Sequence, residues 1–361
     1  MQLVKPRSLR FSWVDTFLWA IRIGALVFIL VGVFGTLTKA LDGEGLTGQA
    51  WRELIVTGLA QGSMYGLIAL GYSMVYGVLG FINFAHGEVF MSGAVTGFFA
   101  ANALADAGVW ESQPVIGLGV TILVSMATST LVAVLIERLA YRPLRGAPRL
   151  IPLITSIGMS FFVQYTFRGL FGESFKSYPV LPTVLQGRIS IFGVDILKTQ
   201  VVVIIVAAVA MAGLYTYVTR TRMGRAMRAI AEDREIAALM GVNVNRVIAL
   251  TFAVGGAMAG VAGVLWALLF RQVYFLTGFL PGIKAFTAAV LGGIGNMAGA
   301  YVGGLALGLF ESVGPLLVLD GWGIPSVSQL KDVVAFSALV LILIFRPTGL
   351  LGERLAVEER G

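Results

Sequence analysis

Ten apolar stretches follow one another along this chain of 361 residues, and most are about 20 residues long. A helix of about 20 apolar residues spans the hydrocarbon core of a bilayer, so the pattern predicts a polytopic membrane protein. Composition agrees, since 57% of residues are hydrophobic and only 12% are charged, and a soluble fold could not cover so much apolar surface. The stretches are Phe17–Leu37, Leu54–Tyr72, Phe84–Leu104, Val115–Ile136, Ile151–Phe171, Val201–Val218, Val247–Phe270, Phe279–Ile294, Ala300–Leu319 and Val333–Phe345.

The predicted fold class is therefore all-α, with about ten transmembrane helices and a range of eight to ten. Two segments set that range. Gly77 and Gly80 interrupt the apolar segment Gly71–Phe84, which favours a re-entrant or unwound piece. The eighth stretch is short and ends in glycines, which leaves open whether it crosses the bilayer fully. The other glycines expected to break helices are Gly292, Gly293 and Gly295.

Basic residues predict the orientation of the helices. With a cytoplasmic N-terminus, sixteen Lys and Arg residues fall on the cytoplasmic side and seven on the other, which is a clear positive-inside bias. An even number of spans then places both termini in the cytoplasm. The sixteen are Lys5, Arg7, Arg10, Arg138, Arg142, Arg145, Arg149, Arg220, Arg222, Arg225, Arg228, Arg234, Arg246, Arg346, Arg354 and Arg360.

Many of the 46 glycines recur at four-residue spacing, as in Gly58, Gly62 and Gly66. Helices in lipid gain little from burying apolar side chains, so small residues that let backbones approach are the main packing device. We expect these glycines to mark close helix–helix contacts. Further glycines with this spacing are Gly256 and Gly260, Gly295, Gly299 and Gly303, and Gly304 and Gly308.

Polar side chains at membrane depth mark the candidate translocation path. Glu88 follows Asn83 and His86 between two apolar runs, and a charge at the bilayer centre costs on the order of 3 kcal/mol. It is either capped locally by Asn83 and His86 or acts as a pathway or gating element. Lys284 and Glu311 lie in later spans, where they either pair with each other or touch solvent near a span end.

The longest hydrophilic stretch is residues 220–246, between the sixth and seventh spans. Its alanines, Leu239 and Met240 favour a short helix, which Gly241 would end. Charge alone favours a solvated linker near lipid headgroups, and a docking surface is the alternative.

That segment contains Glu235-Ile-Ala-Ala-Leu-Met-Gly241, which resembles the EAA-x-x-x-G loop of ABC importer permeases. It departs from the signature at Ile236. Other motifs are similar, in order and spacing, to the LivH-type permeases of branched-chain amino-acid ABC transporters. They are Gly62–Gly77, Ile82-Asn-Phe-Ala-His-Gly-Glu88, Glu137-Arg-Leu-Ala-Tyr-Arg-Pro143, Gly224–Asp233, Lys284–Gly295 and Arg346-Pro-Thr-Gly349.

The resemblance covers about residues 51–354, the expected permease domain, with its coupling loop at 220–246. Residues 1–50 are then an added cytoplasmic tail and helix, and residues 355–361 a cytoplasmic tail. The resemblance implies a subunit in a bacterial inner membrane that forms, with a second LivM-like permease, the path for leucine, isoleucine and valine. Two ABC ATPase subunits would drive it, and a periplasmic binding protein would deliver the substrate. The residues implied in ATPase coupling are Arg225, Ala229, Glu232, Asp233, Glu235, Ala237 and Gly241.

Two other functions are weighed against this one. The same architecture in this family carries urea or short amides. A self-sufficient secondary transporter would need more membrane carboxylates than Glu88 and Glu311. The chain has no Cys, one His and no phosphate-binding Gly-x-x-x-x-Gly-Lys motif, so we expect no catalytic residue, cofactor or metal, and no nucleic-acid partner.

Overall fold

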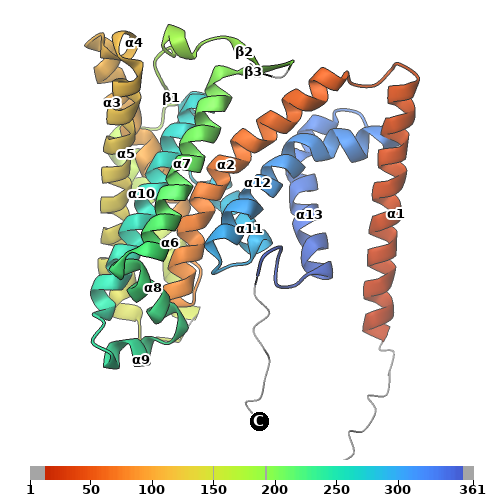
Figure 1. Cartoon of the computed structure of the whole chain (residues 1–361). Helices are drawn as coiled ribbons and strands as arrows, with labels where there is room; N and C mark the ends of the chain where they lie inside the picture. The colour runs from red at the N-terminus through yellow and green to blue at the C-terminus, as the bar shows by residue number, and fades with distance from the viewer. Residues whose placement is uncertain (1–12, 149, 192, 353–361) are drawn as a thin grey trace, which may run out of the picture.

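The computed structural model describes residues 13–148, 150–191 and 193–352, and nearly all of its regular structure is helical (Figure 1). The predictions made for Lys5, Arg7, Arg10, Arg149, Arg354, Arg360 and the tail 355–361 lie outside these residues. Ten helices match the ten predicted stretches. They are α1 (Trp13–Leu41), α2 (Gly48–Leu79), α3 (His86–Asp106), α5 (Pro114–Ile136), α6 (Leu150–Phe171), α7 (Lys198–Arg220), α10 (Val244–Phe270), α11 (Phe279–Gly292), α12 (Met297–Gly314) and α13 (Lys331–Phe345).

Nine of the described helices are long and apolar enough to cross a membrane, which confirms the predicted all-α polytopic fold. Helix α11 is the exception. Its 14 residues rise about 21 Å, less than the roughly 30 Å of a hydrocarbon core. Helix α5 continues through a π turn, η1 (Glu137–Tyr141), and a 3-10 turn, η2 (Arg142–Leu144). Helix α12 continues likewise through η4 (Pro315–Leu319) and η5 (Asp320–Trp322).

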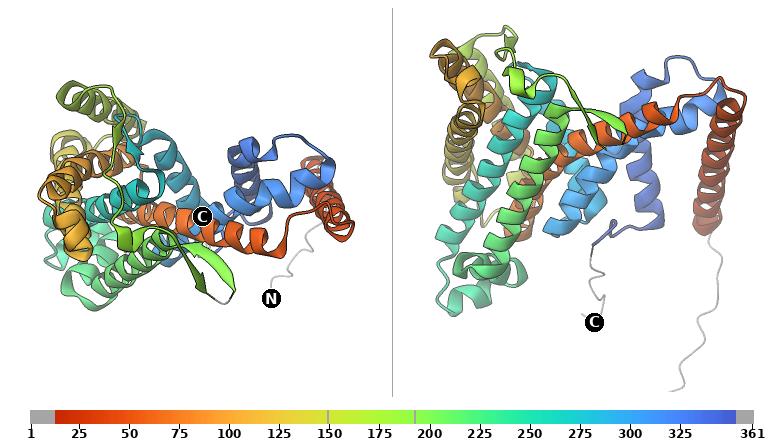
Figure 2. Two further views of the ribbon diagram at one scale, coloured as in Figure 1. Left: turned by 90° about the horizontal axis from the view of Figure 1, so that it is seen from above. Right: turned by 45° about the horizontal axis from the view of Figure 1, so that its top comes forward.

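Glycines set how closely the central helices pack. Helix α2 has 32 residues and crosses the molecule obliquely, with α12 along its side (Figures 1 and 2). A Cβ added at Gly62 would lie 2.7 Å from the carbonyl oxygen of Gly304, and one added at Gly58 would lie 2.9 Å from that of Gly308. The predicted glycine spacing therefore does mark a backbone-to-backbone contact.

Helix breaks fall at some of the predicted glycines. Gly80 ends α2 with φ of 73°, and Gly293 and Gly295, with φ of 105° and 94°, follow α11. Helix α2 nevertheless runs unbroken through Gly71 and Gly77, so the expectation of an unwound Gly71–Phe84 segment is wrong for most of its length. Gly71 is needed in the helix for space, because a Cβ there would overlap the imidazole of His86.

Helices α1 and α13 lie at the edge of the bundle. Helix α1 stands apart from the other helices in Figure 1 and contacts η4, η5 and α13. Arg22 donates a hydrogen bond from Nη2 to the carbonyl oxygen of Ile344 at 2.7 Å, which ties α1 to α13. Most apolar side chains of α1 are exposed in the isolated chain, as expected of a helix that faces lipid.

The two ends of the bundle differ in structure. The start of α1, the α5–α6 connection, the short helices α8 (Arg222–Glu232) and α9 (Arg234–Leu239), and the end of α13 share the lower end in Figure 1. The opposite end carries α4 (Val109–Ser112), η3 (Thr183–Leu185), η6 (Val327–Leu330) and four short strands. Strand β2 (Arg188–Ile191) pairs antiparallel with β3 (Val194–Leu197), and β1 (Lys176–Ser177) with β4 (Gln272–Val273).

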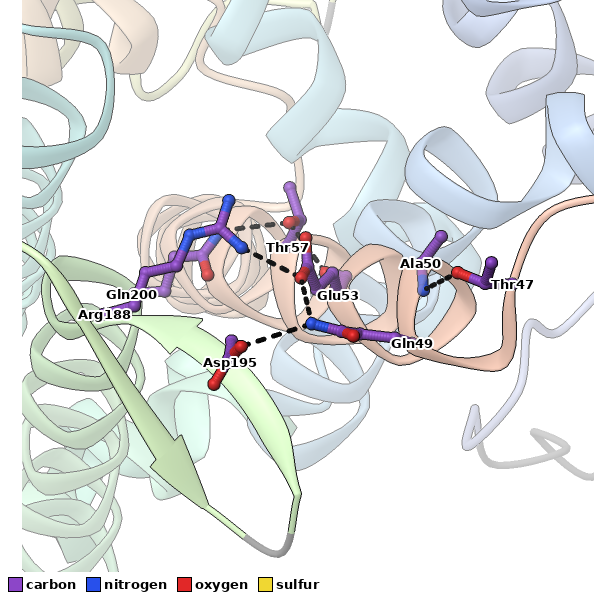
Figure 3. A network of polar contacts seen from close by, with 8 residues as sticks. All are labelled: Thr47, Gln49, Ala50, Glu53, Thr57, Arg188, Asp195 and Gln200. Atoms are coloured by element: carbon purple, nitrogen blue, oxygen red, sulfur yellow. Dashed lines mark hydrogen bonds and ion pairs between the residues drawn. The ribbon is translucent and has the colours of Figure 1, made fainter.

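The β2–β3 hairpin is tied to the first turns of α2 (Figure 3). Arg188 Nη1 donates to Glu53 Oε1 at 2.9 Å, and Gln49 Nε2 donates to Asp195 Oδ2 at 3.3 Å. These contacts fix the loop between α6 and α7 over the entry of α2. The same network includes the Thr47–Ala50 helix cap and the hydrogen bond from Gln200 to Thr57.

Candidate functional site

Glu88 lies in the first turn of α3, where the chain turns back from α2. Gly80 ends α2, and Asn83 Oδ1 then accepts a hydrogen bond from the Ala85 N–H at 3.1 Å, which closes the turn before α3 begins at His86. The positive end of the α3 dipole therefore favours a carboxylate at this position. The Glu88 side chain is buried, with 1% of its surface exposed.

The hydrogen-bond donors to Glu88 come from α6. Gln164 Nε2 donates to Glu88 Oε1 at 2.6 Å, and Ser160 Oγ lies 3.3 Å from the same oxygen. The expected local partners, Asn83 and His86, do not bond to it. The second oxygen, Oε2, is buried and has no hydrogen-bond partner among the described residues. A buried oxygen without a partner is costly, and this oxygen can still accept a hydrogen bond.

A cavity of about 180 Å³ lies against Glu88, between α2, α3, α6 and α11. Gly278, just before α11, closes one side, and a Cβ added there would lie 2.7 Å from Glu88 Oε2. The first turn of α11, with its positive dipole end, therefore starts at the same cavity. The remaining wall is mainly apolar: Tyr72, Phe84, Ile157, Phe161, Phe279 and Ile283.

Asn83 and His86 shape the turn beside the cavity without lining it. Asn83 Oδ1 also accepts a hydrogen bond from the Tyr141 hydroxyl at 2.6 Å. His86 is buried against Gly71, with its ring centroid 5.0 Å from that of Tyr72 in an edge-on contact. Both side chains thus hold the α2–α3 turn against its neighbours. Of the five sequence candidates at membrane depth, only Glu88 reaches the cavity.

Lys284 and Glu311 form a separate cluster where α11, α12 and α13 meet. Lys284 Nζ lies 2.8 Å from Glu311 Oε1, so the structure bears out the pairing alternative. Asp332 adds a second carboxylate, with Oδ1 at 2.7 Å from the same nitrogen, and Lys331 Nζ lies 3.6 Å from Glu311 Oε1. Two cations and two anions therefore balance one another, and Lys284 also lies 5.7 Å from the ring centroid of Tyr65.

The segment between α7 and α10 folds into two helices, α8 and α9, where the sequence analysis expected one. Asp233 separates them, because its extended backbone stops α8 while its Oδ1 accepts hydrogen bonds from the Glu235 and Ile236 N–H groups at 2.8 and 2.9 Å. Gly241 follows α9 with φ of 84°, as expected of a residue that ends a helix.

The tip of α8 and α9 exposes both charges and apolar side chains. Arg225, Ala229, Glu232, Asp233 and Glu235 are exposed, and Ala237 is buried against the bundle. The chain reverses beside them with Leu239 and Met240 at 86% and 80% exposure. Apolar side chains this exposed on a polar rim are typical of a protein-docking surface.

The described residues contain no group of three or more His, Asp or Glu side chains that could hold a metal ion. Among the described residues, the cavity beside Glu88 and the α8–α9 tip are the two features that bear on the candidate site residues.

Comparison with known proteins gives the family of the chain. A sequence profile of the family described as branched-chain amino acid transport system, permease component, matches residues 54–344. The chain belongs to this family. It is 47% identical to the high-affinity branched-chain amino acid transport system permease protein BraD of Pseudomonas aeruginosa, over 83% of this chain and 95% of that protein. It is 43% identical to the corresponding protein LivH of Escherichia coli, again over 83% and 95%. The comparison with solved structures gave no match.

The motifs in the sequence thus predicted the family of this permease correctly, and the relatives do not favour the urea or amide alternative. A more distant relative, the probable branched-chain amino acid transport permease protein LivH of Methanocaldococcus jannaschii, is 27% identical over 79% of this chain and 88% of that protein.

Sequence reasoning missed the residues that complete each cluster of the permease. Ser160 and Gln164 lie one turn apart on α6, so their i, i+4 spacing in an apolar helix was the available signal. Asp332 follows Lys331 at the start of α13, and charged residues at this position indicate only the polar end of a membrane span. None of these positions is near Glu88 or Lys284 in the sequence, so only the helix packing shows their role.

Proposed function

We propose that this permease is the membrane-spanning subunit of an ABC importer for leucine, isoleucine and valine, and that Glu88 binds the substrate in transit. Membership of the family supports the transport role. The observation that carries the site is the unpartnered Oε2 of Glu88, buried beside an otherwise apolar cavity.

The groups that line the cavity are complementary to a branched-chain amino acid. The Glu88 carboxylate would accept hydrogen bonds from the substrate ammonium group, and the positive end of α11 at Gly278 would attract its carboxylate. Apolar walls such as Ile157, Phe161 and Ile283 would contact the branched side chain. Asn83 and His86 would fix the turn that carries Glu88, whereas Lys284 and Glu311 would hold α11 in place.

A second permease would complete the path. Ile157, Phe161 and Phe279 line the cavity and are 44%, 51% and 49% exposed in this chain, so one wall of the cavity lies at the molecular surface. A LivM-like subunit placed there would enclose the substrate. A periplasmic binding protein would deliver it at the end that carries the β2–β3 hairpin.

The α8–α9 tip would dock on one of two ABC ATPase subunits, and these subunits would hydrolyse the ATP, since this chain has no phosphate-binding Gly-x-x-x-x-Gly-Lys motif. Gly241 must keep its left-handed backbone for α9 to present Leu239 and Met240, and a β-branched residue there would cost about 1–2 kcal/mol of strain. We expect Gly241→Val to reach the membrane but to uncouple ATP hydrolysis from uptake. Uptake at the wild-type rate would reduce this segment to a linker.

The proposed location is the bacterial inner membrane, with both termini and the α8–α9 tip in the cytoplasm. The support is the positive-inside bias of the sequence. The chain has no Cys, so a single Cys at the exposed Ala229 can report the sidedness. It should resist an impermeant thiol reagent in intact cells and react after lysis. Labelling in intact cells would reverse the topology.

Competition for uptake by the assembled transporter tests the proposed substrate. Unlabelled isoleucine and valine should compete with labelled leucine, and urea should not. The matched control is 4-methylpentanoate, which has the side chain and carboxylate of leucine but no ammonium group. It should fail to compete if Glu88 binds the ammonium, and equal competition by this acid would contradict the assignment.

A further inference from the structure

A cavity of about 480 Å³ lies at the same end of the molecule as α8 and α9, between the end of α5 and the start of α10. Three arginines surround it: Arg138 and Arg142, one turn apart on the η1 and η2 extension of α5, and Arg246 in the first turn of α10. The positive-inside bias explains the side of the membrane on which they lie, but not why all three line one cavity.

The three guanidinium groups are available to a ligand. All three residues are exposed, and within the described ranges none of them is joined to a carboxylate by an ion pair. The nearby Glu137 is taken by Arg145, which also donates to Asn245. Because Glu137 pairs with Arg145, it does not neutralise the three arginines that line the cavity, and their positive charges have no counter-ion within the described chain.

The start of α10 adds further attraction for an anion. Asn243 caps this helix through its Oδ1, which accepts a hydrogen bond from the Arg246 N–H at 3.0 Å. The cavity therefore lies at the N-terminus of a 27-residue helix, where the dipole is positive, and Asn243 and Asn245 both line it.

The rest of the cavity is apolar and extends into the bundle surface. Val134 lies one turn before Arg138 on α5, and Ala249, Leu250 and Ala253 lie along α10. Ala253 is seven residues from Arg246, which places it about 10 Å deeper along the helix axis. The cavity thus has arginines at one end, at the membrane boundary, and extends from there as an apolar groove between two transmembrane helices.

We propose that this cavity binds an anionic phospholipid, with the phosphate among Arg138, Arg142 and Arg246 and an acyl chain along Val134, Leu250 and Ala253. Basic pockets between transmembrane helices at the cytoplasmic surface have the chemistry that anionic headgroups require. A free phosphate would use the arginines but leave the groove unfilled. A docked acidic protein would reach the arginines but not the wall that lies within the membrane.

The test uses the full chain purified from membranes and stripped of lipid. Native mass spectrometry should show it retaining dioleoyl phosphatidylglycerol over dioleoyl phosphatidylcholine, and phosphatidylglycerol should raise its melting temperature. In the triple variant Arg138→Gln, Arg142→Gln, Arg246→Gln, retention of phosphatidylglycerol should fall by about tenfold or more. The control removes the same charge from the same end of the molecule through Arg220→Gln, Arg222→Gln and Arg225→Gln, and it should keep the lipid.

A second variant separates the possible occupants and does not depend on the folding of the triple variant. Ala253→Phe fills the groove and leaves all three arginines, so it should lose phosphatidylglycerol while keeping any response to inorganic phosphate. Stabilisation by inorganic phosphate equal to that by phosphatidylglycerol would overturn the lipid assignment. Equal lipid retention in the triple variant and its control would also overturn it, as would loss of ATPase binding with unchanged lipid retention.

Discussion

Glu88 and Glu311 are both carboxylates buried in the bundle, with 1% and 3% of their surfaces exposed, but their surroundings differ. Glu311 has two cations nearby, Lys284 and Lys331, in a cluster that also includes Asp332. Glu88 has only neutral donors, Ser160 and Gln164, at Oε1, while Oε2 of either glutamate has no hydrogen-bond partner within the described chain.

This difference supports the proposal that Glu311 has a structural role and Glu88 a functional one. A balanced buried ion pair needs no ligand, and it joins α11, α12 and α13 through side chains that do not line the cavity. Among the described residues, Glu88 has no cation beside it, and the proposal is that the ammonium group of the substrate supplies one. Burial alone would not have told the two apart.

The largest expected loss of stability comes from a substitution that breaks the Glu311 cluster. Lys284→Gln would leave Glu311 and Asp332 without their shared cation and should destabilise the protein by about 3 kcal/mol. Membrane abundance and the melting temperature in detergent should both fall. The double variant Lys284→Gln, Glu311→Gln removes both charges and should recover most of the loss. Normal abundance of the single variant would mean that Lys331 replaces Lys284 or that the pair contributes little.

A smaller effect sharpens the Glu88 side of the comparison. Gln164→Leu keeps a side chain of similar size but removes the 2.6 Å hydrogen bond to Glu88, which should cost about 1–3 kcal/mol and misplace the carboxylate. Leucine uptake should fall more than abundance does. Gln200→Leu is the matched control, because Gln200 bonds to Thr57 away from the cavity, and its uptake should follow its abundance. Similar ratios of uptake to abundance in both variants would show that Gln164 has no role in transport at the Glu88 site.

Most of the fold could be predicted from the sequence because its signals are local. A run of apolar residues predicts a membrane span regardless of where the helix packs. The short length of α11 could likewise be predicted from the short apolar stretch at Phe279–Ile294. The spacing of Gly58 and Gly62 predicted a close helix–helix contact, and the structure shows that the partner is α12. The division into an added N-terminal helix and a permease domain stays a prediction.

The site could be predicted only in part, because its partners come from distant segments. Glu88 stood out as a charge in an apolar run, but Gln164 is 76 positions away, and nothing in either segment connects them. His86 and Asn83 were predicted as partners of Glu88 because they are close to it in the sequence. In the structure, α3 begins at His86, and the two side chains contact Tyr72 and Tyr141 instead. The break between α8 and α9 was missed for a similar reason, since Asp233 can continue a helix or cap one.

The most direct test of the central claim is leucine uptake by Glu88→Gln in the assembled transporter, at equal membrane abundance. Gln keeps the shape and can still accept the hydrogen bond from Gln164, so folding should be unaffected. It removes the charge that binds an ammonium group, and a charged hydrogen bond contributes about 1.5–3 kcal/mol, so uptake should fall by about tenfold to a hundredfold. Glu53→Gln, which loses a carboxylate on the outer surface, should transport normally. Uptake by Glu88→Gln equal to that of Glu53→Gln would show that Glu88 only supports the turn between α2 and α3.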